Sequence, residues 1–388
     1  MPDHLIEKTS NNHLTIVTNE RGELTDKVVK KLLNEGKQVA LLNLLDFTAD
    51  KKWSDLGVAE YSFNNLNKDI FSKKILDFIH LHPKFIIENN HNIFTYYHEE
   101  KQIIKNVFLS IKHLKQLNRF ITVISSDGLL GRGFYDNTYI TSPFAGGLSG
   151  LIKTLSREMI HNSTYCRYLD IDYKINNNKA SSIIIEELYD SNKGTLEVGR
   201  TENNERYTLE IIKENFNENE YNISNTTINQ NPLFLVSGGG KGIAPYCLLK
   251  LAKSFKCRFI LLGRSEYLQS LPLWINLSDN EIKEHIVEDL KNKKQDISLP
   301  TVKKIFQQMM ASREIKETIS KIKDLGSVAF YLQADITNNN ISEKIKSIET
   351  KYGKISGIIH AAGNLSDKRI ENKSAEDFEK VYSVKIDG

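Results

Sequence analysis

Apolar and polar residues alternate along the chain in short runs that predict strands and helices following one another. Residues 14–18 form an apolar run typical of a strand, and Leu24, Val28 and Leu32 then recur at helical spacing before Gly36 ends the helix. Further strands are predicted at residues 39–42, 85–87, 120–124 and 165–169, and a further helix at 103–114. This βα repeat is typical of a doubly wound parallel sheet.

A change of composition divides the chain. Residues 195–212 predict a closing pair of strands, whereas residues 213–231 are crowded with Asn and Glu and show no sustained apolar period. We interpret residues 213–231 as a linker between a first subdomain, 1–212, and a second subdomain, 232–388.

The second subdomain repeats the βα pattern. Strands are predicted from residue 233 and at 258–262, 328–332 and 355–359. The connection between Glu266 and Lys323 is unusually long, and apolar residues recur in it at helical spacing from Val302 to Ile322. We therefore expect an amphipathic helix there rather than a loop.

The segment Ser237-Gly-Gly-Gly-Lys-Gly242 joins an apolar strand directly to a helix-forming stretch. Residues without a Cβ let the backbone approach a pyrophosphate, and the free N–H groups of a helix start attract its charge. Arg264 follows the next strand, 26 residues after Gly238. An acidic residue near that position would bind the ribose of NAD, whereas an arginine favours the 2′-phosphate of NADP. The pattern predicts an NADPH site.

Composition excludes several classes of function. The chain has 388 residues, enough for two or three domains, and its net charge of +3 with no basic block argues against nucleic acid as a partner. We find no apolar run of the ~18 residues that a bilayer span needs and no signal peptide, so we expect no membrane partner and a cytoplasmic location. Cys166, Cys247 and Cys257 are too few and too irregularly spaced for a zinc site. No metal is expected.

Six motifs stand in order along the second half of the chain: Ser237-Gly-Gly-Gly-Lys-Gly242, Leu262-Gly-Arg-Ser265, Ala311-Ser-Arg-Glu-Ile315, Ala334-Asp-Ile-Thr337, His360-Ala-Ala-Gly363 and Val384-Lys-Ile-Asp-Gly388. Together they resemble a ketoreductase domain of a polyketide or polyunsaturated fatty acid synthase, of the short-chain dehydrogenase/reductase superfamily. The long helical connection is similar to that of trans-acyltransferase assembly lines. The resemblance covers nearly the whole chain and implies an α/β fold of two Rossmann-like doubly wound subdomains, a cofactor-free structural half followed by an NADPH-binding half.

The resemblance implies a role for each matching position. The cofactor-binding residues would be Ser237, Gly238, Gly239, Gly240, Lys241, Gly242 and Ile243 at the pyrophosphate loop, Lys241, Arg264 and Ser265 at the 2′-phosphate, Asp335 and Ile336 at the adenine, and Ala361, Ala362 and Gly363 at the nicotinamide ribose. Ser237 replaces the family's usual threonine, and Ala244 stands where many members have a third glycine. Taken singly, the glycines are also compatible with a bare tight turn, and Arg264 with a solvated surface residue.

Two further positions concern catalysis and stereochemistry. Lys385 matches the family's catalytic lysine, which is implied to hold the cofactor ribose and to lower the pKa of the tyrosine acid. Without its flanking motif, Lys385 would be interpreted as an exposed helix lysine. Leu365-Ser-Asp367 resembles the Leu-Asp-Asp signature of ketoreductases that make the D-configured alcohol, although its middle residue differs. His360 is assigned no role.

The expected reaction of the intact domain is hydride transfer from NADPH to the β-keto group of an acyl thioester on an acyl carrier protein. The family's catalytic serine, tyrosine and asparagine lie downstream of the lysine, beyond Gly388. We therefore expect the chain to be inactive alone and to need a complementing C-terminal segment or other megasynthase domains as partners. We also expect an unpaired sheet edge beside residues 355–359.

Other interpretations remain open. Ser126 and Tyr139 are spaced like the family's serine and tyrosine, but Pro143 follows where an asparagine or lysine belongs and the first half has no glycine loop. We interpret this pair as the relic of a repeat. The alternative function is a non-catalytic scaffold or docking module of a megasynthase. An unrelated free-standing dehydrogenase is weaker, because the first half shows no recognisable substrate site.

Overall fold

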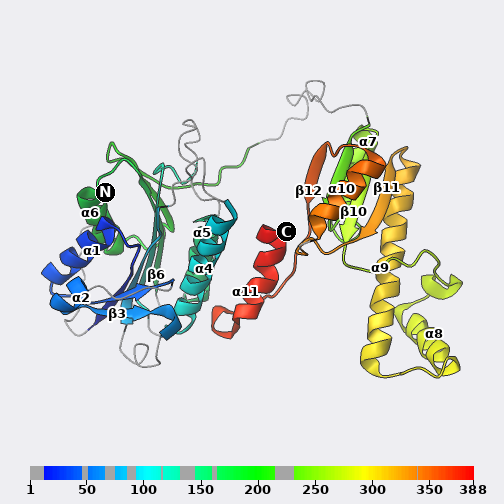
Figure 1. Ribbon diagram of the computed structural model, residues 1–388, viewed down its shortest axis with the longest axis horizontal. Coiled ribbons are helices and arrows are strands. Elements are labelled where there is room, and N and C mark those ends of the chain that lie inside the picture. The colour runs from blue at the N-terminus through cyan, green and yellow to red at the C-terminus, as the bar shows by residue number, and fades with distance from the viewer. Residues whose placement is uncertain are drawn as a thin grey trace. The chain divides into compact units, whose positions relative to one another are not determined.

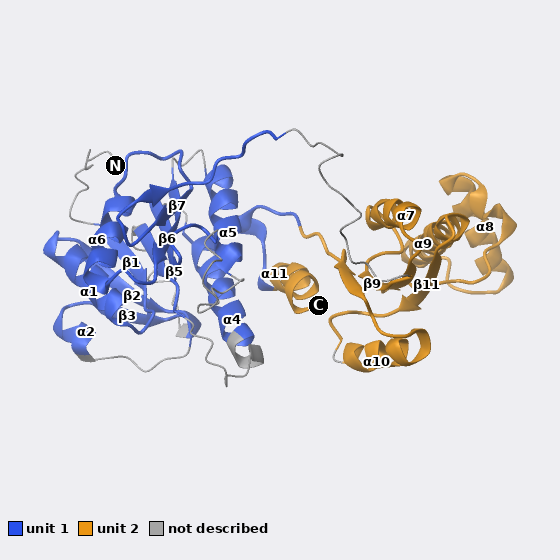
Figure 2. Ribbon diagram, turned by 90° about the horizontal axis from the view of Figure 1, so that it is seen from above, with its two compact units in different colours: residues 1–214, 367–375 blue, residues 215–366, 376–388 orange. Residues whose placement is uncertain are grey.

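The protein is described by a computed structural model in which residues 13–45, 51–65, 75–84, 93–114, 117–131, 145–159, 164–214, 231–338 and 340–388 are placed (Figure 1). The chain divides into two compact units, which Figure 2 distinguishes by colour. The first unit comprises residues 1–214 and 367–375, and the second comprises residues 215–366 and 376–388. Most of the predicted linker lies outside the described residues, and each unit is built on a sheet of its own.

The sheet of the first unit has eight strands whose order is β3-β2-β1-β4-β5-β6-β7-β8. The strands are β1 (Leu14–Thr18), β2 (Gln38–Asn43), β3 (Ala59–Ser62), β4 (Ile75–Leu81), β5 (Arg119–Ser126), β6 (Tyr165–Asp172), β7 (Glu197–Arg200) and β8 (Arg206–Tyr207). Every neighbouring pair is parallel except β7 and β8. The order reverses at β1, as it does in a doubly wound sheet.

Helices cover both faces of this sheet. They are α1 (Glu23–Asn34), α2 (Lys51–Asp55), α4 (Ile93–Lys112), α5 (Ala145–Glu158) and α6 (Asn177–Leu188). α1 and α6 lie on one face and α4 and α5 on the other (Figures 1 and 2). Val28 of α1 and Ile184 of α6 are fully buried against Val17, Leu41 and Ile121 of the strands. The apolar spacing that predicted α1 is therefore its core-facing stripe.

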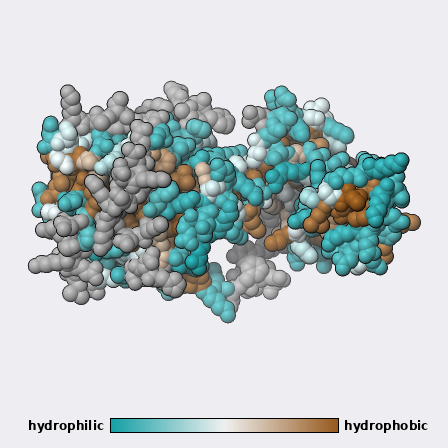
Figure 3. All heavy atoms as spheres, turned by 90° about the horizontal axis from the view of Figure 1, so that it is seen from below, coloured by the Kyte–Doolittle hydropathy of each residue, from teal (hydrophilic) through white to brown (hydrophobic). Residues whose placement is uncertain are grey.

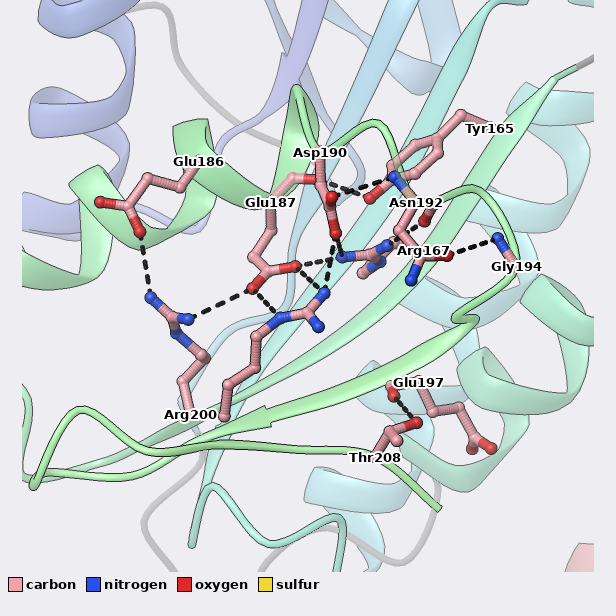
Figure 4. Close-up of polar contacts among 11 residues, drawn as sticks. Tyr165, Arg167, Glu186, Glu187, Asp190, Asn192, Gly194, Glu197, Arg200 and Thr208 are labelled. Carbon is pink, nitrogen blue, oxygen red and sulfur yellow. Dashed lines mark hydrogen bonds and ion pairs between the residues drawn. The ribbon is translucent and has the colours of Figure 1, made fainter. Parts of the chain in front are cut away.

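A buried charge network fastens the antiparallel end of this sheet to α6 (Figure 4). Arg167 of β6 is fully buried and hydrogen-bonds Glu187 and, at 2.9 Å, Asp190. Arg206 of β8 hydrogen-bonds Glu187 and Asp190, each at 2.8 Å. Buried charges are tolerated when they are paired in this way. The network fixes the short strand β8, which is only two residues long and could form few ladder hydrogen bonds.

The second unit has a four-stranded parallel sheet whose order is β11-β10-β9-β12. The strands are β9 (Leu233–Ser237), β10 (Arg258–Gly263), β11 (Val328–Gln333) and β12 (Gly357–His360). This order repeats that of the first four strands of the first unit. In the part of the chain that the structure describes, β12 pairs with β9 alone, and Ile358 is 72% exposed. The predicted unpaired edge is confirmed.

Three helices enclose this sheet. α7 (Ala244–Ser254) and α9 (Leu299–Asp324) lie on one face and α10 (Ile341–Tyr352) on the other (Figure 2). Leu248 of α7 and Ile322 of α9 pack with Phe259 and Leu261 in one apolar cluster, and Ile348 of α10 belongs to the cluster of the opposite face. A further helix, α11 (Ala375–Tyr382), is followed by a π-helical turn at Ser383–Asp387.

The long connection after β10 forms a helical hairpin. It contains a 3-10 helix (Leu273–Asn276), α8 (Asp279–Asn292) and α9. A capping box between Ser278 and Glu281 starts α8, and Ile282, Ile286 and Met309 form the hairpin's own apolar interior. The predicted helix is confirmed.

Apolar side chains also gather on the surface of the second unit (Figure 3). Among the described residues, no helix combines the length and the apolar character that crossing a membrane requires.

The structure places two strands, β3 and β4, where the sequence pattern did not. β4 occupies Ile75–Leu81, in a stretch without a clear apolar period, whereas the strand predicted at 85–87 lies outside the described residues. The pattern is obscured because Asp77 and His80 are buried in β4. Asp77 pairs with Arg119 at 3.2 Å, and His80 contacts Thr18 at 3.0 Å. The strand predicted at 355–359 is observed as β12, at Gly357–His360.

Candidate nucleotide-binding site

A cavity of about 1130 Å³ opens at the carboxyl ends of β9, β10, β11 and β12. Its walls contain residues from every motif of the second half: Gly238, Gly240, Lys241, Gly242, Ile243, Gly263, Arg264, Ser265, Glu314, Asp335, Ile336, Ala361, Ala362, Gly363, Leu365 and Val384 are among them. In an open α/β sheet this edge is the ligand-binding edge, and the sheet order reverses here between β9 and β12. The fold therefore brings together most of the residues predicted to bind a cofactor.

The glycine loop has the backbone that the pattern predicts. Gly238 has a φ of +70°, and a Cβ on it would lie 2.9 Å from the backbone of Ala362. Gly242 has a φ of +76° and stands two residues before the start of α7, and a Cβ on it would meet no atom within 4 Å. Only glycine adopts such angles without strain. The loop thus passes close to the end of β12 on one side and lines the cavity with Gly240, Gly242 and Ile243 on the other.

Ser237 lies beneath this loop. Its side-chain Oγ lies 2.8 Å from Nδ1 of His360 and accepts the N–H of Ala362 at 3.3 Å. Ser237 is 6% exposed. It joins the ends of β9 and β12 and so positions the loop. His360, which received no role from the sequence, is its hydrogen-bond partner.

Two cations stand at the outer end of the cavity. The Lys241 ammonium donates to Oγ of Ser265 at 3.1 Å, and the Arg264 guanidinium donates to Oδ1 of Asn364 at 2.7 Å. A second cavity of about 700 Å³ is lined by both cations, by Ser265 and by Lys304. The positive charges of Lys241, Arg264 and Lys304 therefore lie near the end of β10. The role of Asn364 could not be foreseen, because it lies 100 positions from Arg264.

Asp335 and Ile336 form the wall after β11. The Asp335 carboxylate accepts two hydrogen bonds from Thr337, from its hydroxyl at 2.7 Å and from its N–H at 3.0 Å. These bonds, with a smaller contribution from the charge of Arg264, lower the pKa of Asp335. The side chain of Asp335 therefore shapes the turn, and Ile336 provides apolar surface in the cavity wall.

Lys385 lies beside Gly363, which lines the cavity. A Cβ on Gly363 would lie 2.9 Å from Cε and 3.1 Å from Nζ of Lys385, so the exposed lysine lies directly over this glycine. Leu365 is 80% exposed and lines the cavity. Asp367 is exposed, is not among the described cavity-lining residues and begins the segment that groups with the first unit.

Two residues that the sequence did not single out also contact the site. The Tyr331 hydroxyl donates to the carbonyl of Ser265 at 2.7 Å, and burial raises the pKa of Tyr331 to about 12. Glu314 of α9 accepts the N–H of Gly242 at 2.6 Å. Glu314 belongs to the motif Ala311-Ser-Arg-Glu-Ile315, so the signal was present in the sequence without an assigned role.

Of the Ser126 and Tyr139 pair of the first unit, only Ser126 lies among the described residues. Tyr139 lies outside the described residues. Ser126 is 4% exposed at the end of β5, where its N–H donates to Asp170 at 3.1 Å. Burial, with the nearby charge of Asp127, raises the pKa of Asp170 to about 8. Ser126 therefore belongs to a buried strand end.

The fold is that of an α/β protein of the Rossmann type, and its second unit carries a cavity at the edge where such sheets bind ligands. The family model of the KR domain matches residues 233–388. This part of the chain is therefore similar to the ketoreductase domains of polyketide synthases, and a domain of this family implies an oxidoreductase. A fold of this kind suggests a nicotinamide cofactor.

Curated relatives support the assignment. A polyunsaturated fatty acid synthase of Thraustochytrium sp. (strain ATCC 26185 / S-3) is 28% identical over 280 residues, which cover 69% of this chain and 10% of the relative. Polyketide synthase PksM of Bacillus subtilis (strain 168) is 27% identical over 165 residues, covering 42% of this chain and 3% of the relative. The chain therefore spans at most about a tenth of the length of these relatives.

Solved structures share the fold. An N-terminal ketoreductase from the macrolactin assembly line has a TM-score of 0.60 at 14% identity, covering 99% of this chain and 67% of that chain. A multidomain structure with adenylation, ketoreductase and pseudo Asub domains from a keto acid-selecting NRPS module has a TM-score of 0.62 at 13% identity, covering 100% of this chain and 29% of that chain. The predicted family resemblance and fold class are confirmed.

Proposed function

We propose that this chain supplies the NADPH-binding part of a ketoreductase that reduces β-ketoacyl thioesters carried on an acyl carrier protein. The observation that carries the proposal is the cavity at the ends of β9 to β12, which is lined by the glycine loop, by Lys241 and Arg264, and by Gly363, beside which Lys385 lies. A dinucleotide needs a phosphate-binding loop, cations and a polar contact to its ribose.

The loop supports the dinucleotide part of the proposal. A Cβ on Gly238 would meet the backbone of Ala362, so the loop lies as close to the neighbouring strand end as only glycine allows. On its other side, a Cβ on Gly242 would meet no atom within 4 Å. The N–H groups at the start of α7 and the positive end of the helix dipole would bind the pyrophosphate there. The small residues Ala361, Ala362 and Gly363 would admit the nicotinamide ribose.

The charges support NADPH over NADH. Lys241 and Arg264 both lie where β10 ends, at the position where the adenine ribose of a Rossmann site binds. Within the part of the chain that the structure describes, their side chains donate to the neutral side chains of Ser265 and Asn364. Exchanging these neutral partners for a 2′-phosphate would gain two charge-assisted contacts.

The bound cofactor would supply a hydride to the β-keto carbon. Lys385, over Gly363, would hold the nicotinamide ribose and stabilise a neighbouring general acid in its reactive form. The serine, tyrosine and asparagine implied by the family resemblance have no assigned counterpart within residues 233–388. We therefore propose that a complementing segment or neighbouring megasynthase domain provides them, next to the open edge of β12. Leu365 and Asp367 would bias the product toward the D-configured alcohol.

Titration with NADPH and NADH tests the cofactor part of the proposal. We expect the chain to quench or shift the fluorescence of NADPH at lower concentrations than that of NADH. Turnover is then measured with a small β-keto thioester, with and without a polypeptide that carries the closing strands of a ketoreductase. The proposal is supported if the chain by itself binds NADPH and turnover is seen only when the polypeptide with the closing strands is added. Binding without turnover in either case supports the scaffold alternative, and failure to bind NADPH refutes the cofactor site.

A further inference from the structure

The carboxylate of Glu314 lies on the glycine loop. Its Oε1 accepts the backbone N–H of Gly242 at 2.6 Å, a short charge-assisted hydrogen bond. Gly242 stands two residues before the start of α7, so this N–H belongs to the amides at a helix start that have no intrahelical acceptor. Glu314 also lines both the large cavity and the adjoining one. A negative charge of the protein therefore lies at the phosphate-binding position of the loop.

The helix that carries Glu314 is fixed against the same loop. A Cβ on Gly240 would lie 3.0 Å from Cγ1 of Ile315, which is 1% exposed. The hydroxyl of Thr318 donates to the carbonyl of Gly240 at 3.1 Å. Residues 314, 315 and 318 lie on one side of α9, because i and i+4 share a helix face. The backbone of Glu314 is thus held by packing, while its exposed side chain can rotate away from the loop.

A carboxylate and a pyrophosphate compete for this N–H. Both are anions that bind the unbonded amides of a helix start, and both are stabilised by the positive end of the helix dipole. They cannot share the position without like-charge repulsion. The neutral loop partners of the cations, Ser265 and Asn364, impose no comparable cost.

We propose that Glu314 is a resident counter-anion of the glycine loop, which satisfies the Gly242 N–H in the free protein and must be displaced by the pyrophosphate of a dinucleotide. This inference rests on the proposed function and deepens it. Glu314 sets the affinity of the cofactor without touching the reacting atoms. Because α9 carries it, Glu314 links the helical hairpin to the cofactor loop in addition to the contacts of Ile315 and Thr318 with Gly240.

The test compares Glu314→Gln with the matched control Glu317→Gln. Glu317 lies on the same helix, is about half exposed and pairs with Lys321 at 3.6 Å, so its variant makes the same charge change away from the loop. We expect Glu314→Gln to lower the Kd for NADPH by about two- to fivefold at low ionic strength, the range of one charge at a helix terminus. This gain in NADPH affinity should become smaller as salt is added. Glu317→Gln should leave the Kd unchanged.

Adenosine 2′-monophosphate separates displacement from a general charge effect. It carries the phosphate that Lys241 and Arg264 would bind but has no pyrophosphate. We expect Glu314→Gln to leave its Kd unchanged, whereas a general gain in positive potential would tighten it as well. Glu314→Ala is a second variant that removes the hydrogen bond entirely, and it should tighten NADPH binding in the same direction.

Three results would overturn the inference: NADPH binding that is unchanged or weaker in both Glu314 variants, an equal gain in Glu317→Gln, or an equal gain for adenosine 2′-monophosphate. In each of these cases wild-type binding of NADPH still supports the proposed function. If neither the wild-type chain nor any variant binds NADPH, the proposed function and the inference fail together.

Discussion

The Oγ of Ser237 lies 2.8 Å from Nδ1 of His360, and this contact joins the carboxyl ends of two neighbouring strands at the cofactor edge. The strands are β9 and β12, and His360 pairs in register with Ser237. The same hydroxyl accepts the N–H of Ala362. One small buried side chain therefore sets the distance between the glycine loop and the wall opposite it.

Ser237→Ala should destabilise the second unit. The substitution removes a partner from both His360 and the Ala362 N–H, and losing a hydrogen bond of a partly buried group costs about 1 kcal/mol. Urea unfolding followed by circular dichroism would measure the loss. Ser237→Thr keeps the hydroxyl and should retain most of the stability. Equal stability of the alanine variant and the wild-type chain would show that the contact contributes nothing.

Gly238→Ala and Gly242→Ala form a matched pair. Both glycines have positive φ, of +70° and +76°, so each substitution costs about 1 kcal/mol in backbone strain. Only at Gly238 would the new Cβ also collide with backbone, 2.9 Å from Ala362. We expect Gly238→Ala to lower the free energy of unfolding by clearly more than Gly242→Ala. If the two losses are equal, the loop does not pass β12 as closely as the structure shows.

Arg264→Ala should change cofactor selectivity. The guanidinium lies beside Asn364 at the end of β10, and removing it would take one charge-assisted contact from the 2′-phosphate of NADPH, worth roughly tenfold in Kd. The Kd for NADH, which lacks that phosphate, should change little. Titration of the variant with both cofactors measures the ratio of the two Kd values. Equal weakening for NADPH and NADH would place Arg264 elsewhere in the site.

The sequence was informative wherever local pattern decides structure. The strand at Leu14–Thr18, the helix at Glu23–Asn34 and the glycine loop are short segments whose spacing alone predicts them. The cofactor cavity was also foreseeable, because the ends of parallel strands meet at one edge. β4 was not foreseeable, since the buried Asp77 and His80 interrupt its apolar run and find their partners on other strands.

Contacts between residues far apart in sequence were beyond prediction. Glu314 and Gly242 are separated by 72 positions, and Arg264 and Asn364 by 100. Neither pairing leaves a local signal, because each depends on how the helical hairpin and β12 are placed on the sheet. The motif around Glu314 marked the segment without indicating which residue would meet the loop.

Arg167→Met should strongly destabilise the first unit. It would leave Glu187 and Asp190 buried without the Arg167 guanidinium (Figure 4), although Arg206 would still contact both. Removing one partner of a buried ion pair costs about 3–5 kcal/mol. Lys27→Met is the control, since Lys27 forms an exposed i,i+4 pair with Glu23 worth at most about 0.5 kcal/mol. Denaturant unfolding measures the free energy of unfolding of both variants. Similar losses of that free energy would show that the network contributes no more to stability than a surface ion pair.

The buried Asp170 predicts how stability depends on pH. Burial and the neighbouring Asp127 raise its pKa from 3.8 to about 8, so the folded protein keeps a proton that the unfolded chain releases in this window. The contribution of Asp170 is therefore full below about pH 4, falls as the pH rises, and is lost above about pH 8. The slope for one proton is at most about 1.4 kcal/mol per pH unit.

Asp170→Asn tests this dependence. The amide cannot titrate, so the free energy of unfolding of the variant should fall less steeply with pH than that of the wild-type chain between pH 4 and 8. We expect some loss at low pH, because an amide nitrogen cannot accept the N–H that Leu130 donates to Oδ2 of Asp170. Asp55→Asn, at the exposed end of α2, should keep the wild-type slope. Parallel pH profiles for wild type and Asp170→Asn would show that Asp170 is ionised in the folded protein, which would require its carboxylate to be better solvated than its buried position at the end of β6 allows.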